Sequence, residues 1–567
     1  MAVSISASSP SSPWRRALPG GRGWGLVAAV LLGAALVALP VAGVFASFVH
    51  AEQSADTLRH LLAYVVPRAA WETLVLSLLV TAGVTVLGTT SAWLVAALDF
   101  PGRRFFQWAL LLPLAMPGYI VAYAYTDLLQ YAGPVQSALR GAFGWERDDY
   151  WSPDIRSLPG AALVFTLVLY PYVFLLARTA FAGRTASMVD AARSLGLSPW
   201  QTWRRVNLPL ARPAVAAGTL LALMETLADY GAVSYFGVQT FTTSIYRAWF
   251  NLGDRLAASQ LAAVLLLVVL LVVALEIRAR GQARFFTAPN SARPAPRTAL
   301  RGGRAALAFA GCCVPLALGF VLPVAALLNL FAASSTTVDW SRYAQWLGNT
   351  VLVGALAAML TLAAVVGVAF AVRLAPRGGA GGAIRFGARA MNLGYAVPGA
   401  VIAVGILIPL AAFDNAVDGW LRSAFGVGTG LLFTGSVIAL LYAYLVRYFA
   451  VAYQPIEAGL ARITPAMEAS ARCLGASPWE AFRRVHLPLL APSALAAALL
   501  VLVDVMKELP ATLVLRPFNF DTLAVIAYQM AADERLGEAA LPSLTIVAVG
   551  LLPVIWLSRA IERGSGR

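Results

Sequence analysis

Runs of apolar residues long enough to cross a lipid bilayer constrain this chain more than any other feature of its sequence. A spanning helix needs about 20 mostly apolar residues, because about 30 Å of hydrocarbon is crossed at about 1.5 Å per residue. The chain is 60% hydrophobic and 12% charged, whereas soluble domains hold about 25% charged residues. We therefore expect an all-α membrane protein with twelve transmembrane helices, at residues 24–48, 71–98, 105–128, 159–182, 213–237, 258–277, 305–331, 349–373, 390–413, 430–453, 491–515 and 540–558.

Arginines between the apolar runs predict which side of the membrane each loop faces. The net charge is +15, and all but one of the 42 Lys and Arg residues are arginine. A basic soluble protein would suggest nucleic-acid binding, but this surplus lies in short segments between spans, so we expect no nucleic-acid partner. By the positive-inside rule, both termini are cytoplasmic and the loops around Asp149 and Glu534 face outward. The basic segments hold Arg15, Arg16, Arg22, Arg103, Arg104, Arg184, Arg193, Arg204, Arg205, Arg212, Arg373, Arg377, Arg385 and Arg389.

A linker and an internal repeat divide the chain into two halves. Residues 281–304 are rich in Arg, Pro and Ala and contain no run of spanning length, so we assign a first half at 1–280 and a second at 305–567. The sequence DAARSLGLSPWQTWRRVNLPLARP from Asp190 matches ASARCLGASPWEAFRRVHLPLLAP from Ala469 at a constant offset of 279 residues. Because six spans separate the two copies, we expect two parallel six-helix repeats.

Each copy predicts a capped helical loop, which we call an elbow, at 185–213 and 464–492. A glycine in each copy favours the left-handed end of a short helix, and a Ser-Pro pair favours the start of the next. The residue three positions after each serine completes a capping box. These residues are Gly196, Ser198, Pro199 and Gln201 in the first copy, and Gly475, Ser477, Pro478 and Glu480 in the second. An ordinary connector needs only a few residues, so a docking surface for a cytoplasmic partner is favoured over a solvated loop.

The elbows resemble the EAA loops of ABC-importer permeases, which carry E-A-A, three residues, Gly and then a spaced I-x-L-P. The resemblance implies the type I importer permease fold, with two ABC ATPase subunits seated on the elbows. In the second copy the acid is displaced by one position, to Glu468. The implied docking residues are Asp190, Ala191, Ala192, Gly196, Ser198, Pro199, Arg204, Arg205 and Pro209, and Glu468, Ala471, Gly475, Ser477, Pro478, Arg483, Arg484 and Pro488.

Chemistry-bearing motifs for an enzyme or a bound cofactor are missing from the sequence. It contains no HExxH motif and no phosphate-binding GxxxxGK[ST] loop, and its three cysteines and three histidines have no metal-ligand spacing. We therefore expect a transport subunit that is not an enzyme and binds no metal or cofactor, with ATP and Mg²⁺ used by the separate ATPase.

Acidic residues inside the fifth and eleventh spans are candidates for a translocation path. Glu225 and Asp229 correspond, at the same offset, to Asp504 and Glu508. Four residues apart, each pair should lie on one helical face. Charges within a span are costly and usually face a cavity or a partner, so two interpretations remain open: lining of a cation path, or an ion-pair network with Lys507 that braces the spans.

Pro-Gly pairs interrupt the third and ninth spans at corresponding places. Pro117 and Pro398 should break their helices and free carbonyl groups, which at membrane depth must face protein or a water-filled path. A role for these breaks in the path and simple helix packing both remain open.

The acidic blocks ETLADYGAVSYFGVQTFTT and DVMKELPATLVLRPFNFDTLAV closely resemble the permeases of iron(III) ABC importers. Those permeases are fused twelve-span chains of the bacterial inner membrane, fed by a periplasmic ferric-binding protein. The resemblance implies import of ferric iron by alternating access. Thiamine importers share the fused architecture and the elbows, and a twelve-span secondary transporter is a more distant alternative.

Overall fold

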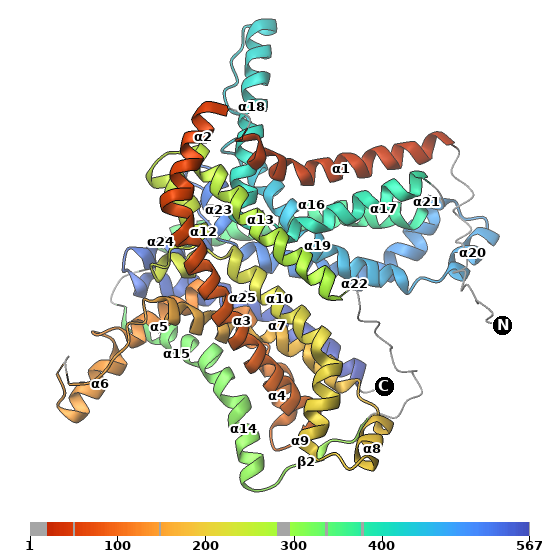
Figure 1. The fold of residues 1–567 in the computed structure, drawn as a ribbon. Coiled ribbons are helices and arrows are strands. Elements are labelled where there is room, and N and C mark those ends of the chain that lie inside the picture. Colours follow the sequence, from red (N-terminus) through yellow and green to blue (C-terminus); the bar gives the residue numbers. More distant parts are fainter. Residues whose placement is uncertain are drawn as a thin grey trace. The chain divides into compact units, whose positions relative to one another are not determined.

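The structure is a computed structural model that describes residues 20–48, 51–146, 149–280, 295–334, 338–375 and 379–565. These residues are almost entirely helical (Figure 1). Eleven helices are long and apolar enough to cross a membrane, and a twelfth span is formed if the pair Arg103–Ala115 and Gly118–Phe143, bent by 92°, counts as one. The expected all-α membrane protein is confirmed. Arg15, Arg16 and linker residues 281–294 lie outside the described residues.

The chain forms two compact units, of which the larger contains most of the first half and both the beginning and the end of the second. Here η denotes a short 3-10 or π-helical turn. The larger unit holds α2 (Ala51–His60), η2 (Leu61–Val65), α3 (Val66–Ala97), β1 (Leu98–Asp99), α4 (Arg103–Ala109), η3 (Leu112–Ala115), α5 (Gly118–Leu129), α6 (Pro134–Phe143), α7 (Leu158–Ala182), α8 (Ala186–Ser194), α9 (Pro199–Thr202), η4 (Trp203–Asn207), α10 (Leu208–Ala228), α11 (Gly231–Tyr235), α12 (Phe241–Tyr246), η5 (Arg247–Asn251), α13 (Arg255–Arg280), β2 (Thr298–Ala299), α14 (Gly303–Leu316), η6 (Ala317–Val321), α15 (Leu322–Ala333), α23 (Pro510–Leu515), α24 (Leu523–Ala532) and α25 (Leu536–Ser565).

The smaller unit contains the rest of the second half together with the first helix of the chain. Its elements are α1 (Gly20–Ala46), α16 (Trp340–Leu374) from Asn349 onward, α17 (Gly379–Asn392), η7 (Leu393–Ala396), α18 (Gly399–Phe425), α19 (Val437–Ala461), α20 (Pro465–Cys473), α21 (Pro478–Ala481), η8 (Phe482–His486) and α22 (Leu487–Met506). The compact units therefore cut across the sequence halves, because α1 packs with second-half helices and α14 and α15 pack with first-half helices.

Helix α1 packs directly on α17 and α18 in the smaller unit. A Cβ atom at Gly43 would overlap the carbonyl oxygen of Gly405, and one at Gly405 would overlap the carbonyl oxygen of Pro40. Small residues of this kind let membrane helices approach backbone to backbone. The hydroxyl of Tyr442 also donates a hydrogen bond to the carbonyl of Leu36.

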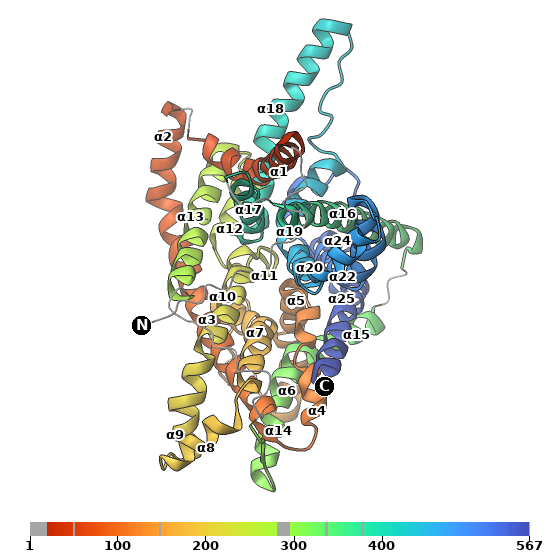
Figure 2. The ribbon, with the colours of Figure 1, turned by 90° about the vertical axis from the view of Figure 1, so that its right-hand side faces the viewer.

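In the larger unit, α3, α7 and α10 pack against one another, and α14 lies along α3 and α4. Two short strands tie the described end of the linker to the end of α3: Leu98 pairs with Thr298 and Asp99 with Ala299, in parallel. The elbow helices α8 and α9 and the start of α14 lie at the same end of this unit (Figure 2).

Four of the expected spans are broken or shortened. Spans three and nine are interrupted at Pro117 and Pro398, as predicted, and each proline begins the following helix as its N-cap residue. Spans five and eleven end earlier than expected, at Ala228 and Met506, and short helices α11 and α23 follow. Apolar residues resume on the far side of both breaks, so the length of the apolar run did not reveal them.

Candidate functional site

The first elbow has the local structure that its sequence predicts. Helix α8 ends just before Gly196, whose φ of +73° is left-handed. Ser198 caps α9, accepting from the backbone N–H of Gln201 at 3.3 Å, while the Gln201 side chain accepts from the Ser198 N–H at 2.9 Å. Pro199 is the first residue of α9. The capping box is therefore confirmed.

The second elbow repeats this arrangement at the offset of 279 residues. Gly475 has a φ of +82°, and α21 begins at Pro478. The Glu480 side chain accepts from the Ser477 N–H at 2.9 Å, and Ser477 Oγ accepts from the Glu480 N–H at 3.3 Å. Both elbows then continue into a π-helical turn, η4 and η8, before the spanning helix. Pro209 and Pro488 are the second residues of these helices, where a missing N–H is tolerated.

Each elbow exposes the same set of apolar and basic side chains. The arginine pairs Arg204-Arg205 and Arg483-Arg484 are exposed in both copies. Trp200 is 64% exposed and Trp479 is 68% exposed, and each stacks on the aromatic ring three residues later. Before the spanning helices α10 and α22 begin, the exposed large apolar residues are Met188, Leu195 and Trp200 in the first elbow and Met467, Leu474 and Trp479 in the second. Duplicated exposure of large apolar side chains is typical of a binding surface.

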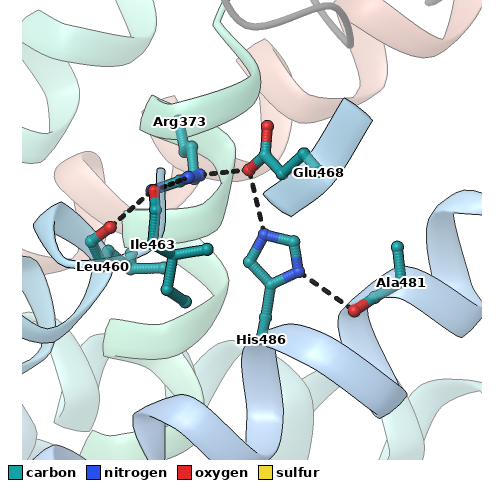
Figure 3. A network of polar contacts seen from close by, with 6 residues as sticks. All are labelled: Arg373, Leu460, Ile463, Glu468, Ala481 and His486. Atoms are coloured by element: carbon teal, nitrogen blue, oxygen red, sulfur yellow. Dashed lines mark hydrogen bonds and ion pairs between the residues drawn. The ribbon is translucent and has the colours of Figure 1, made fainter. Parts of the chain in front are cut away.

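Glu468 does not lie on this surface. It is 1% exposed, and its Oε1 accepts from Arg373 Nε at 2.6 Å and contacts His486 Nε2 at 3.0 Å (Figure 3). Arg373 also donates to the carbonyls of Leu460 and Ile463, both at 2.6 Å. The prediction that Glu468 contacts a docking partner directly is therefore wrong, because its carboxylate is buried and forms an ion pair with Arg373 of the same chain. Asp190, by contrast, is exposed, as are Ala191, Gly196, Ser198 and Pro199, whereas Ala192 is buried.

The first elbow lacks this buried network. At the same offset, Val189 takes the place of Glu468 and Asn207 takes the place of His486. The two elbows thus share their exposed surface but differ in how they attach to the helices behind them.

Replacing Glu468 by glutamine is expected to destabilise the smaller unit. The amide loses the charge that faces Arg373, and removing one partner of a buried ion pair costs about 3–5 kcal/mol. Thermal unfolding of the purified chain followed by intrinsic fluorescence measures the effect. The control Asp190→Asn alters an exposed carboxylate that lies 4.0 Å from Arg193 and should leave the melting temperature unchanged. Equal melting temperatures for both variants would contradict this assignment.

The acids of spans five and eleven lie at helix breaks. Asp229 follows the last residue of α10, and its Oδ1 accepts from the N–H of Ala232 at 2.9 Å and of Val233 at 3.3 Å. In the second repeat, Glu508 accepts from the N–H of Ala511 at 2.8 Å and of Thr512 at 2.9 Å. The equivalent acids therefore cap the equivalent short helices α11 and α23.

The expectation that each acid pair shares one helical face is wrong. Glu225 lies in the last turn of α10 and Asp504 in the last turn of α22, but the helix ends before Asp229 and Glu508. Capping is a role that neither sequence interpretation included. An acid followed within two residues by Gly or Pro is a signal for such a cap, and both copies carry it.

The larger unit brings three of the predicted path residues close together. A Cβ atom at Gly118, next to Pro117, would lie 3.8 Å from Asp229 Oδ2. A Cβ at Gly231 would meet Leu509, next to Glu508, and also Tyr119. Glu225 belongs to the same unit, whereas Asp504 and Pro398 belong to the smaller unit. There the carbonyl of Asp504 accepts from the Tyr448 hydroxyl at 3.2 Å.

Tyrosines lie around the helix breaks of the larger unit. Tyr230 stacks on Tyr246 with ring centroids 3.7 Å apart, and the Tyr528 hydroxyl donates to Tyr230 Oη at 3.2 Å. Tyr119 and Tyr123 are buried, and within the described residues their hydroxyls have no hydrogen-bond partner. A buried hydroxyl without a partner is costly unless water or a solute reaches it. We use the name oxygen cluster for the two acids Asp229 and Glu508 together with the five tyrosines Tyr119, Tyr123, Tyr230, Tyr246 and Tyr528.

The fold and the paired elbows define the class of protein: a membrane permease with two similar surfaces to which separate energy-supplying subunits can bind. The sequence matches the family described as "Binding-protein-dependent transport system inner membrane component" over residues 84–280 and again over 385–567. The chain belongs to this family. It is accordingly a multi-pass inner-membrane subunit of an ABC importer, works with a substrate-binding protein and ATPase partners, and is not itself an enzyme.

The individual relatives that the chain resembles include some named for different transported substances. The chain is 26% identical to the Fe(3+)-transport system permease protein FbpB 2 of Haemophilus influenzae, over 86% of this chain and 88% of the relative. It is 25% identical to the probable ABC transporter permease protein y4fN of Sinorhizobium fredii, over 88% of each. It is 26% identical to the molybdenum transport system permease protein ModB of Escherichia coli, over 34% of this chain and 86% of that protein.

Proposed function

We propose that this permease imports ferric iron that a periplasmic binding protein delivers. Two ATPase subunits bind the two elbows, and their ATP-driven closure rocks the two repeats so that the path opens alternately to each side. Both termini face the cytoplasm, and ATP and Mg²⁺ are bound by the ATPase subunits. The duplicated elbow, with equivalent caps and equivalent exposed side chains, is the observation that carries the importer mechanism.

The oxygen cluster supports the choice of cargo. Carboxylate and phenol oxygens suit a hard, highly charged cation better than an apolar organic solute. The full-length similarity to a relative named for Fe(3+) transport points in the same direction. Asp229 accepts from two backbone N–H groups, and Glu508 accepts from two backbone N–H groups and from the Thr512 hydroxyl. An ionised carboxylate attracts a cation electrostatically even while it accepts such hydrogen bonds.

The cargo is tested by ATPase stimulation in proteoliposomes that contain the permease and its ATPase. A ferric-loaded binding protein should stimulate ATP hydrolysis, whereas a thiamine-loaded binding protein should not. Stimulation by the thiamine-loaded protein alone would identify the alternative cargo. Uptake driven by an ion gradient without ATP would instead support a secondary transporter and contradict the importer mechanism.

Removing the exposed tryptophan from each elbow should weaken binding of the ATPase. Trp200→Ala and Trp479→Ala truncate the largest exposed apolar groups of the two elbows, and aromatic anchors of this kind contribute about 2 kcal/mol or more to an interface. Co-purification of the ATPase with the double variant measures the loss. Trp151→Ala, which removes a tryptophan 87% exposed outside the elbows, should retain the ATPase as wild type does. Full retention by the elbow double variant would contradict the docking role.

A further inference from the structure

Four arginines converge at the end of the larger unit where the first elbow begins. Arg103 starts α4, Arg178 lies near the end of α7, Arg184 precedes α8 and Arg297 precedes β2. The N–H of Ala295 donates to the carbonyl of Arg184 at 3.0 Å, and Thr298 pairs with Leu98 at the end of α3, so the segment that carries Arg297 lies against both. Arg178 reaches the carbonyl of Gln107 in α4, the helix that Arg103 starts. Burial, together with the positive charge of Arg297, lowers the pKa of Arg184. We call these four residues the basic cluster.

The chain supplies little negative charge to the basic cluster. Arg103 donates to Asp99 at 3.2 Å, and within the described part of the chain this is the cluster's one salt bridge. Arg178 donates to the carbonyl of Gln107 at 2.7 Å, and Arg184 donates to the carbonyl of Phe181 at 2.8 Å. Carbonyl groups orient the guanidinium groups but do not neutralise them. Half-buried charges without a counter-charge are costly, so an external anion would stabilise this site.

The second repeat shows what is missing. Leu460 is the equivalent of Phe181 at the 279-residue offset, and its carbonyl also accepts from a guanidinium, that of Arg373. There the arginine is neutralised inside the chain by Glu468. In the first repeat the carbonyl of Phe181 accepts from Arg184. Val189 stands at the position of Glu468, so the first elbow offers Arg184 no equivalent carboxylate.

Apolar side chains next to the basic cluster favour a lipid over a free ion. Phe309 of α14 lies against Gly102, since a Cβ built there would be 3.2 Å from its ring, and it packs edge-on against Phe106. Phe309, Phe105 and Leu307 are exposed. Basic pockets flanked by membrane helices at the bilayer surface typically hold lipid headgroups.

We propose that the basic cluster binds the phosphate group of an anionic phospholipid, whose charge takes the place that Glu468 fills in the second repeat. The acyl chains lie along the exposed apolar residues of α4 and α14. The bound lipid thereby joins the end of α3, the end of α7 and the described end of the linker at the base of the first elbow.

Native mass spectrometry of the purified full-length chain, titrated with phosphatidylglycerol, tests this proposal. Arg297→Gln removes an exposed charge of the cluster, and Arg178→Gln removes a half-buried one. Each should weaken phosphatidylglycerol binding about fivefold, because a basic residue at a lipid surface contributes about 1 kcal/mol. The control Arg385→Gln with Arg389→Gln removes two charges from α17, as many as the double variant Arg178→Gln with Arg297→Gln removes from the cluster, and should bind as wild type does.

Three further arms separate the sources of phosphate. Phosphatidylcholine with the same acyl chains should bind weakly to wild type and variants alike, and millimolar inorganic phosphate should not displace phosphatidylglycerol. Val189→Glu, which copies the second repeat, should lower the affinity for phosphatidylglycerol. Unchanged binding in Arg297→Gln and in the double variant Arg178→Gln with Arg297→Gln would overturn the proposal. Displacement of the lipid by inorganic phosphate would overturn its lipid source.

Discussion

A valine in place of Gly475 is expected to separate ATP hydrolysis from transport. Gly475 has a φ of +82°, and a Cβ built there meets nothing within 4 Å, so the substitution causes backbone strain without a steric clash. A left-handed conformation costs an L-residue about 1–2 kcal/mol, and a β-branched residue tolerates it least. The strain rearranges the turn that positions Trp479 and the capped helix α21, which we propose to seat in the ATPase.

The measurement compares uptake and ATP hydrolysis in the same proteoliposomes. Uptake by Gly475→Val should fall at least roughly tenfold, a change that corresponds to about 1.4 kcal/mol, while the chain still inserts into membranes. Gly475→Asn should be milder, because asparagine tolerates the left-handed region. Gly426→Val provides a matched control, since Gly426 has a φ of +70° with open space around it but lies at the end of α18, outside both elbows. Coupled transport at wild-type rates in Gly475→Val would sink the docking role of the elbow.

Removing the charge of Asp229 should lower iron uptake while the ATPase still co-purifies. Asparagine keeps an oxygen that can accept from the N–H groups of Ala232 and Val233, so the cap on α11 survives and only the charge is lost. If Asp229 faces the passing cation, uptake by Asp229→Asn should fall at least roughly tenfold, the equivalent of about 1.4 kcal/mol.

Asp229→Ala distinguishes the charge from the cap. Alanine removes both functions, and loss of a cap costs about 0.5–2 kcal/mol of stability. A charge role predicts similar uptake defects in both variants, with a lower melting temperature only in the alanine variant. Normal uptake in Asp229→Asn together with an unstable Asp229→Ala would show that the acid serves structure alone.

The elbows could be predicted in detail because their signals are local. Ser198, Pro199 and Gln201 specify a capping box within four residues, and Gly196 specifies the preceding turn. Duplication at a fixed offset then supplied a second, independent reading of the same pattern. The break at each Pro-Gly pair was equally predictable, because proline removes a backbone donor and glycine next to it is the poorest helix former after proline. Prolines without such a glycine, such as Pro171, lie inside unbroken helices.

Contacts distant in sequence could not be predicted in this way. Arg373 and Glu468 are 95 residues apart, so nothing near Glu468 shows that it is buried. Tyr230 and Tyr528 meet across nearly 300 residues, and Tyr528 lies outside every span expected from the sequence, so no hydrophobicity pattern predicts their contact. The breaks after Ala228 and Met506 were missed because apolar composition predicts how long a membrane-spanning segment is. It does not predict whether the backbone hydrogen bonds of the helix continue without interruption along that segment.

The packing of α1 has a consequence for how the protein is made. Tyr442 and Leu36 are 406 residues apart, yet they form a hydrogen bond within one compact unit. During synthesis, α1 therefore enters the membrane long before α17 and α18 are made. Until then, the face of α1 that contains Gly43 contacts lipids or translocation factors instead of its final partners. Separating the two halves at the linker would leave each fragment without a helix that packs into its own core, since α1 packs with second-half helices and α14 and α15 pack with first-half helices. Two such fragments should fold into a stable protein only when both are produced in the same cell. Fusion of the two halves in one chain ensures that both are always present.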